Sequence, residues 1–599
     1  MKNNEKLQTI SRLKGRLFGS VLFSAAWGRV LGLALLTFSA MPSYAGSRLI
    51  LDGNSPTSSG AKFATDLNHH MDSTGMVTVI VQFRQMPNSP GLRNWRGRGA
   101  AIHSTLHTIR AVTMRIPANM LPVLEKDPNV LYVTPDRPVS MTGANEEYAT
   151  AVEADVAAAQ YGFDGTGVGV AIIDSGVADH VDLHDATGAS RVVYSQSFVP
   201  GNTSAVDQYG HGTHVAGLLG GTGLSSGSTN GYASKFAGMA PNVNIINLRV
   251  LDQNGSGTDS GVIAAIQQAI ALKNTYNIRV ISMSLGRPVF ESYTLDPVDQ
   301  AVEAAWQAGI VVVVAAGNNG RDNSMHTHGW ATIGVPGNDP AVITVGATRT
   351  KNTATRADDA IASYSSRGPT LVDHIAKPDL VAPGNRMVSL RDVGSTLDTK
   401  FPSFQVAPAT GTTPKYFRLS GTSMATPLVS GAVALMLQQN PALTPDQVKA
   451  RLMKTAWKGF GQYCSSLDDL GNGYNNQYDL FTYGAGYLDV EAALSDTNLA
   501  AGVALSPTAV HNLDGTVSLT DTSAPGFTGV SVVWGGTSVV WGTSVVWGAN
   551  TLSANSVVWG GTSVVWGATS DVGYSVVWGA TSITAQPMAA FSDGDDGEN

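Results

Sequence analysis

The stretch GTSMATP, residues 421–427, carries a serine into the beginning of an apolar run. Gly421 and Thr422 favour a turn, and residues 424–437 are apolar enough to form a buried helix. Ser423 is therefore predicted at a helix N-terminus, where unpaired backbone N–H groups and the helix dipole stabilise a developing negative charge. Serine before an apolar run is also a common N-cap, so the stretch gains its meaning from the residues upstream.

Length and composition limit the classes of protein to which the chain can belong. With 599 residues it is too long for one ordinary domain, and 43% hydrophobic residues are ample for a large core. Only 14% of the residues are charged and the net charge is -8, so we expect no nucleic-acid partner. The single cysteine, Cys464, excludes an intramolecular disulfide, and we expect a structural thiol there rather than a reactive one.

The N-terminus has the pattern of an export signal. Basic residues precede the apolar run at residues 30–41, and the SYA pattern at residues 43–45 is typical of a signal cleavage site. We expect residues 1–45 to be a secretory signal peptide, and the protein to be secreted or displayed on the cell surface. The apolar run is shorter than the ~20 residues that span a bilayer. An uncleaved anchor is the alternative.

Two further segments follow, with different patterns. In residues 46–145, the runs 76–83 and 111–116 alternate as strands do, and residues 119–125 suit a helix, which predicts a small α+β domain. Residues 146–495 contain near-continuous apolar runs separated by helical patterns, which predicts an α/β domain whose parallel sheet has helices on both faces. These predicted strands are residues 168–173, 245–250, 280–285 and 310–315.

Polar residues follow the first of these strands. Because functional groups gather beyond the carboxyl ends of parallel strands, Asp174 is a candidate for the site, with turn capping as its alternative. In HGTHVAG, residues 211–217, small residues let the backbone pack closely around His211. His211 and His214 are also spaced as a metal pair. No Glu follows in an HExxH arrangement, so we assign no metal.

The motifs DSG (174–176), HGTHVAG (211–217) and GTSMATP (421–427), in this order, resemble those of the subtilase family of serine proteases. The resemblance covers residues 150–495. It implies an Asp-His-Ser triad in which Asp174 orients His211, and His211 accepts the proton of the nucleophile Ser423. The implied function is a serine endopeptidase that hydrolyses protein or peptide substrates through an acyl-enzyme, with no cofactor required.

The same resemblance implies further site residues. AAGNNG, residues 315–320, resembles the family's oxyanion loop and assigns Asn318 as a donor beside the Ser423 N–H, whereas Asn319 suits a turn. Two further segments resemble the primary pocket and the edge that pairs with an extended peptide, although each also suits a simple turn. The residues assigned to the pocket are Ser284, Leu285 and Gly286, and those assigned to the edge are Ser256 and Gly257.

The resemblance to the subtilase family extends to the N-terminal domain, whereas some segments of the chain depart from the family's pattern. The ending DPNVLYVTPD, residues 127–136, resembles the close of an inhibitor propeptide, which implies that residues 46–145 inhibit the enzyme until cleavage within residues 141–147. The calcium loop of compact relatives is not recognisable in residues 222–233, so a structural calcium is not assigned. The chain between Gly384 and Ser423 is long, which predicts an extra loop at about residues 393–416 near the site. Residues 321–330 also look inserted.

The C-terminal segment, residues 496–599, is dominated by a repeat. The sequence SVVWG occurs six times, with tryptophans at 534, 541, 547, 559, 566 and 578. Repeated β-branched residues, Trp and Gly favour stacked strands, so the tail is β-rich or else disordered. It would then self-associate or attach to a cell surface. Two alternatives for the whole chain are an assembly protein on an inactive protease scaffold and a zinc hydrolase that uses His211 and His214.

Overall fold

The computed structural model describes residues 62–64, 67, 75–139, 151–324, 327, 329–353, 355–409, 413–460, 463–467, 472–500, 502–511 and 517–520. The predicted signal peptide, the cleavage window at residues 141–147 and the Trp repeat lie outside these residues. No helix within the described ranges is both long and apolar enough to cross a bilayer.

Residues 75–135 form a small α+β unit with one antiparallel sheet, in the order β2-β3-β1-β4. Its elements are β1 (Met76–Phe83), α1 (Ser89–Gly97), β2 (Ala101–Leu106), β3 (Ala111–Pro117), α2 (Leu121–Lys126) and β4 (Val130–Pro135). The two predicted strands are β1 and β3, which lie side by side, and alternate residues such as Val79 and Met114 fill the core of the unit. The chain then continues as β5 (Pro138–Val139).

The larger part of the described chain is built on an eight-stranded sheet. The strands are β6 (Gly169–Asp174), β7 (Val192–Ser197), β8 (Asn244–Arg249), β10 (Ile278–Met283), β11 (Val311–Ala315), β12 (Ile343–Arg349), β13 (Ala360–Ile361) and β14 (Leu380–Pro383). Their order is β13-β12-β11-β10-β6-β8-β7, with β14 also beside β12. Every pair is parallel except β12 with β13. The predicted α/β class is confirmed.

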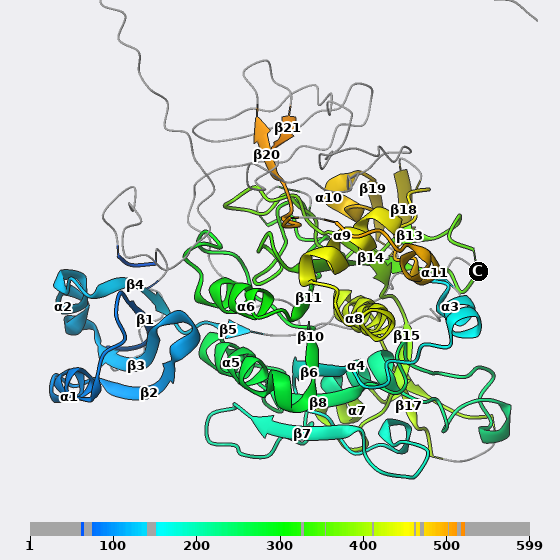
Figure 1. The fold of residues 1–599 in the computed structure, drawn as a ribbon, viewed down its shortest axis with the longest axis horizontal. Helices are drawn as coiled ribbons and strands as arrows, with labels where there is room; N and C mark the ends of the chain where they lie inside the picture. The colour runs from blue at the N-terminus through cyan, green and yellow to red at the C-terminus, as the bar shows by residue number, and fades with distance from the viewer. Residues whose placement is uncertain are drawn as a thin grey trace, which may run out of the picture. The chain divides into compact units, whose positions relative to one another are not determined.

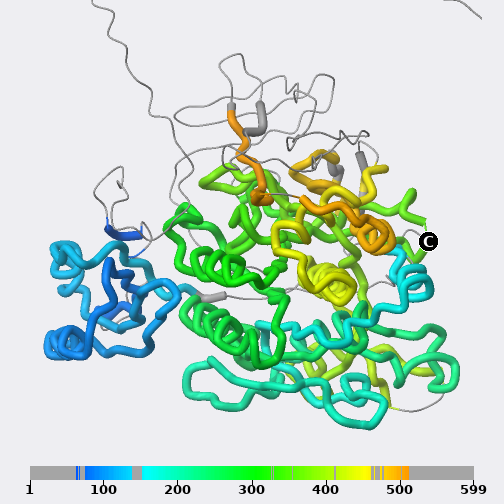
Figure 2. The backbone as a smooth tube through the Cα atoms, viewed as in Figure 1, coloured from blue at the N-terminus to red at the C-terminus, as the bar shows by residue number. Residues whose placement is uncertain are grey.

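Helices cover both faces of this sheet (Figure 1). α5 (Asp259–Tyr276) and α6 (Pro297–Gln307) pack together on one face, and α4 (His211–Gly220) and α8 (Thr422–Gln439) on the other. The backbone trace follows the chain from α5 in green to α8 in yellow (Figure 2). α8 packs against β10, β11, β12 and β14. The serine at its first turn contacts Ser284 and therefore lies at the carboxyl end of β10.

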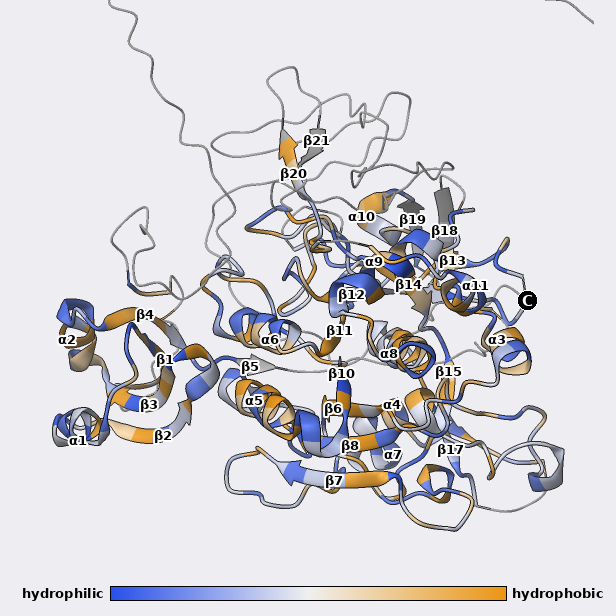
Figure 3. Ribbon diagram, in the orientation of Figure 1, coloured by the Kyte–Doolittle hydropathy of each residue, from blue (hydrophilic) through white to orange (hydrophobic). Residues whose placement is uncertain are grey.

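The sequence explains these elements. The strands β6 and β11 are buried along their whole length because both faces are covered, whereas the edge strand β7 alternates between partly buried and exposed residues. The hydropathy of the elements agrees with this difference between covered and edge positions (Figure 3). Hydrophobic residues are concentrated on α4 and α8, whereas one half of the edge strand β7 is hydrophilic. The side chain of Asp296 caps α6 by accepting from Val298 N at 2.9 Å, as its Asp-Pro start predicts.

The segment predicted as an extra loop, about residues 393–416, lies next to the loop that precedes α4. It contains α7 (Thr396–Lys400) and β16 (Gln405–Val406), and it is flanked by β15 (Met387–Leu390) and β17 (Tyr416–Leu419). Thr396 N donates to Gln208 O at 3.1 Å, and Leu397 N donates to Tyr209 O at 3.0 Å. This segment therefore supports the two residues that lead into Gly210 and His211.

The described chain contains further α-helices and strands. They are α3 (Ala154–Tyr161), β9 (Gly257–Thr258), α9 (Pro445–Thr455), β18 (Tyr463–Leu467), β19 (Gly473–Gln477), α10 (Leu480–Tyr483), α11 (Val490–Ser495), β20 (Thr508–His511) and β21 (Val517–Thr520). α9 begins with a capping box, in which Thr444 and Gln447 each bond the other's backbone. Ser506 lies in the core beyond α11, where its hydroxyl donates to Asp379 Oδ1 at 2.6 Å.

Candidate active site

Asp174 and His211 meet where β6 ends and α4 begins. His211 Nδ1 lies 3.1 Å from Asp174 Oδ1 and 3.2 Å from Oδ2, and each residue is only 1% exposed. A carboxylate accepts hydrogen bonds, so Nδ1 carries the proton and Nε2 is left as the basic nitrogen. Nε2 is buried and has no hydrogen-bond partner among the described residues.

A second carboxylate, Asp207, organises the loop before α4. Its oxygens accept from Tyr209 N (3.0 Å), Gly210 N (2.8 Å) and Thr213 N (2.8 Å). Ser175 Oγ donates to Asp207 at 2.9 Å and accepts from the backbone N–H of the residue after His211. Burial raises the pKa of Asp207, and these hydrogen bonds offset part of that rise. No motif or spacing in the sequence singles this aspartate out.

Ser423 is the second residue of α8 and faces Ser284, which follows β10. Ser423 Oγ donates to Ser284 O at 3.1 Å, and Ser284 Oγ donates to Ser423 O at 2.7 Å. The strand end and the helix start are therefore linked in both directions. Of the three residues assigned to the primary pocket, Ser284 contacts the serine directly. Leu285 is buried, and a Cβ on Gly286 would lie 2.8 Å from Val335 O.

Asn318 follows β11 and lies against the start of α8. Its Oδ1 accepts from Thr422 N at 2.8 Å and from Thr422 Oγ1 at 3.1 Å. A backbone N–H can only donate, so this contact fixes which atom of the amide is the oxygen. The amide nitrogen Nδ2 is buried without a partner among the described residues, and is a donor ready for an anionic oxygen.

Of the predicted peptide-binding edge, Gly257 is already paired with another strand, whereas Ser256 O accepts a hydrogen bond from Asp252 N. β9 pairs antiparallel with β5, with Val139 opposite Gly257 and Pro138 opposite Thr258. Asp259 N also donates to Arg137 O at 2.9 Å. A segment that follows the N-terminal unit therefore occupies this edge as an added strand.

His214 has a role different from that of His211. Its Nε2 lies 3.1 Å from Met387 O and 3.2 Å from Phe417 O, so this nitrogen carries a proton and ties α4 to β15 and β17. Burial, together with the nearby His211, lowers the pKa of His214 to about 3. The two rings thus point to different partners and do not face one common position.

One group of carboxylates in the described ranges has the spacing of a metal site. Oxygens of Glu153, Asp489 and Glu491 lie within 4.8 Å of one another. The guanidinium of Arg356 lies 3.0 Å from Glu153 and 2.6 Å from Asp489. An arginine already neutralises this group, which therefore has the composition of an ion-pair cluster rather than of a metal site.

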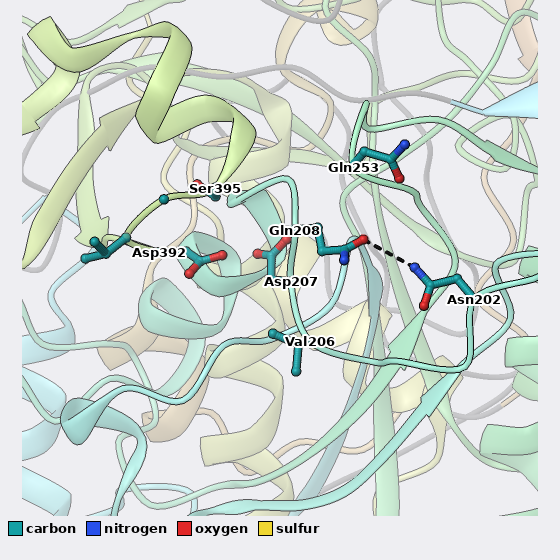
Figure 4. Close-up of a pocket in the computed structure, with 9 residues that line it drawn as sticks. Asn202, Val206, Asp207, Gln208, Gln253, Asp392 and Ser395 are labelled. Carbon is teal, nitrogen blue, oxygen red and sulfur yellow. Dashed lines mark hydrogen bonds between the residues drawn. The ribbon is translucent and has the colours of Figure 1, made fainter.

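A pocket of about 540 Å³ opens where the extra loop meets the loop before α4 (Figure 4). It is lined by Asn202, Val206, Asp207, Gln208, Gln253, Asp392, Val393, Gly394 and Ser395. Asp392 points towards Asp207, and burial raises the pKa of Asp392 to about 7, with smaller contributions from the charges of Asp207 and Asp398. Asp392 Oδ2 is buried with no partner in the described part of the chain.

With this geometry established, comparison with known proteins identifies the family. The model of the subtilase family matches residues 165–486, which include each of the three motifs. The chain belongs to the subtilase family. Subtilases are serine peptidases, and the buried Asp174–His211 pair and the helix-borne Ser423 lie inside the matched region.

Individual subtilases align over different shares of the chain. Serine protease AprX of Bacillus subtilis (strain 168) is 42% identical over 293 residues, which are 48% of this chain and 61% of AprX. Subtilisin E of the same organism is 34% identical over 398 residues, or 66% of this chain and 84% of Subtilisin E. Fervidolysin from Fervidobacterium pennivorans, a keratinolytic enzyme, shares the fold with a TM-score of 0.54 at 22% identity, over 75% of this chain and 64% of fervidolysin.

Proposed function

We propose that this subtilase is the precursor of a secreted endopeptidase whose triad is Asp174, His211 and Ser423. The observation that carries the proposal is the buried contact between Asp174 and His211 Nδ1, at 3.1 Å, which leaves Nε2 as a base with no hydrogen-bond partner in the described part of the chain. Asn318 Nδ2, a buried donor without a hydrogen-bond partner among the described residues, supports the same assignment. Protein substrates and secretion are parts of this proposal, with residues 1–45 as its export signal.

The proposed mechanism follows from these contacts. Ser423 Oγ exchanges its bond to Ser284 O for one to His211 Nε2, which takes the proton as the oxygen attacks the peptide carbonyl. Asp174 holds the imidazole in the tautomer with the proton on Nδ1 and stabilises its charged form. The oxyanion of the tetrahedral intermediate receives hydrogen bonds from Asn318 Nδ2 and Ser423 N. His211 then protonates the leaving amine, and water hydrolyses the acyl-enzyme.

The same proposal assigns the flanking segments. Residues 46–145 act as an inhibitory propeptide, and the pairing of β5 with β9 supports this because it blocks the edge that a substrate strand would use. Removal of the propeptide by cleavage within residues 141–147 would free that edge. For residues 496–599 we propose a role outside catalysis, in self-association or attachment to a cell surface.

The test compares the wild-type chain with Ser423→Ala. We expect the wild type to lose about a hundred residues beyond the signal by intact mass and to hydrolyse fluorescent casein, because processing needs the nucleophile. The variant should do neither. Identical behaviour of the two proteins would refute the assignment of Ser423.

The same preparation separates the two alternative functions. A serine-directed phosphonate should inactivate the wild type, and a chelator should leave its catalytic step intact. The opposite pattern would favour a zinc hydrolase at His211 and His214. Absence of any hydrolysis in a folded wild-type protein would favour an assembly role for the repeat.

A further inference from the structure

Arg137, the residue before β5, is buried in a pocket of the larger α/β part of the chain. Its side chain is 1% exposed, and its Nη1 and Nη2 donate to Glu291 Oε1 and Oε2 at 2.7 and 2.6 Å. The guanidinium also stacks over Phe290, 5.1 Å from the ring centre. Two parallel hydrogen bonds and an aromatic face match the planar fork of arginine and not the compact ammonium of lysine.

The charges around Arg137 show that the pocket is built for a cation. Arg287 Nε binds Asp259 at 2.8 Å and Arg287 Nη2 binds Asp296 at 2.6 Å, while Glu291 faces Arg137. Asp259, Asp296 and Glu291 are thus three buried carboxylates that share only two guanidinium groups. One of these two groups, that of Arg287, belongs to the α/β part, and the other is that of Arg137. Asp259 Oδ2 remains buried and without a partner in the described ranges. Departure of Arg137 would leave an excess of buried negative charge, which is unfavourable unless another cation enters.

The backbone of Arg137 already has the register of a bound peptide. Asp259 N donates to Arg137 O, directly beside the β5–β9 pairs. Ser260 N donates to the side-chain Oδ1 of Asp136 at 2.7 Å, so the residue before Arg137 also contacts the first turn of α5. Arg137 precedes the proposed cleavage window at residues 141–147. The pocket therefore faces a side chain on the N-terminal side of the bond that is cut.

We propose that Glu291, Asp259 and Asp296 form a specificity pocket that selects an arginine upstream of the cleaved bond. The inference rests on the proposed function and adds its substrate class. In the precursor the pocket is filled by Arg137, and after processing it takes an arginine from a substrate that adds a strand to β9. Main-chain bonds along β9 supply affinity for any extended peptide, and the pocket discriminates between side chains.

Two quenched peptides test the proposal on enzyme purified after self-processing of the full chain. One has the sequence TPDRPVSMTGANEE of residues 134–147, and the other carries citrulline in place of its arginine. Citrulline keeps the shape but removes the charge, so we expect kcat/KM to fall about 10- to 100-fold. Equal kcat/KM for the two peptides, with casein still hydrolysed, would overturn the proposed arginine pocket and leave the proposed protease function standing. Failure to cleave casein as well would overturn the proposed function.

Two variants test whether Glu291 causes the preference for arginine over citrulline. Glu291→Gln should reduce the arginine-to-citrulline ratio of kcat/KM at least fivefold, because an amide neither carries charge nor accepts at both atoms. Asp155→Asn removes the same charge from an exposed position on α3 and should keep the wild-type ratio. An unchanged ratio in Glu291→Gln would overturn the assignment. If Glu291→Gln does not fold, the wild-type comparison of the two peptides still decides.

Discussion

Asn318 and Thr422 are joined by two hydrogen bonds, from Thr422 N at 2.8 Å and from Thr422 Oγ1 at 3.1 Å to Asn318 Oδ1. They hold the amide so that Nδ2 remains as a buried donor. We expect Asn318→Ala to slow precursor self-processing about 10²- to 10³-fold, the loss known for such a donor in subtilisin itself. The measurement is the time course of intact mass, a single-turnover readout in which substrate binding has no part.

The adjacent residue provides the control. Asn319 N donates to Ser366 Oγ at 3.1 Å through its backbone, and alanine keeps that bond. Asn319→Ala should therefore process at close to the wild-type rate. Equal slowing in the two variants would show that the loop is merely destabilised and that Asn318 is no oxyanion donor.

Gly212 lies directly beside the Asp174–His211 pair. A Cβ there would be 2.1 Å from Gly176 O and 2.9 Å from Asp174 Oδ1, so alanine has to displace the end of β6. Because small displacements of catalytic groups cost about 10²-fold in rate, we expect Gly212→Ala to lose at least that much self-processing activity. Gly261→Ala is the control, since its Cβ would make ordinary contacts at 3.4 and 3.5 Å. A Gly212→Ala precursor that matures at the wild-type rate would contradict the close packing.

Local sequence patterns predicted much of the fold and the elements that carry two of the site residues. Apolar runs gave β6, β8, β10 and β11 to within a few residues, because strands buried on both faces leave a continuous signal. Asp174 at a strand end and Ser423 at a helix start were placed by the same reasoning. The capping box at Thr444 also has a local signature, the four consecutive residues TPDQ at 444–447.

Contacts between distant residues could not be read in this way. Arg137 and Glu291 are 154 positions apart, and nothing in the spacing of either residue signals the buried pair. Asp207 precedes His211 by four residues in a loop without periodicity, so its role depends on tertiary hydrogen bonds to Ser175 and Thr213. Long-range polar contacts of this kind follow from the fold and leave no local pattern.

The capping box at the start of α9 allows a prediction of stability. Thr444 Oγ1 accepts from Gln447 N at 3.2 Å, and Gln447 Oε1 accepts from Thr444 N at 3.1 Å. In an inactive Ser423→Ala background, Thr444→Ala should lower the free energy of unfolding by about 1 kcal/mol. Gln447→Ala keeps the threonine cap and should lose less. Urea unfolding measures both, and equal losses would contradict the dominance of the threonine.

Asp392 should make stability depend on pH in an unusual direction. Burial raises the pKa of Asp392 to about 7, whereas an aspartate in the unfolded chain titrates near ~3.9. Between these values the folded protein binds a proton that the unfolded chain does not, so this contribution to stability is complete below pH ~4 and lost as pH rises through about 7. In the Ser423→Ala background, Asp392→Asn should match its parent in Tm at pH 4 and exceed it at pH 8.

Asp398, six residues away, is the control, because its pKa is shifted in the opposite direction to that of Asp392. Burial pushes the pKa of Asp398 up, but hydrogen bonds from Arg391 and Gly394 N outweigh this effect and leave its pKa lowered. Arg391 Nε and Nη2 bind its two oxygens at 2.6 and 3.0 Å. A lowered pKa contributes stability above the unfolded value, so Asp398→Asn should lower Tm at pH 8 and much less at pH 3. A lower Tm of Asp392→Asn at pH 8 would contradict the prediction for Asp392. It would mean that Asp392 is ionised and paired in the folded protein, whereas its buried Oδ2 has no partner in the described part of the chain.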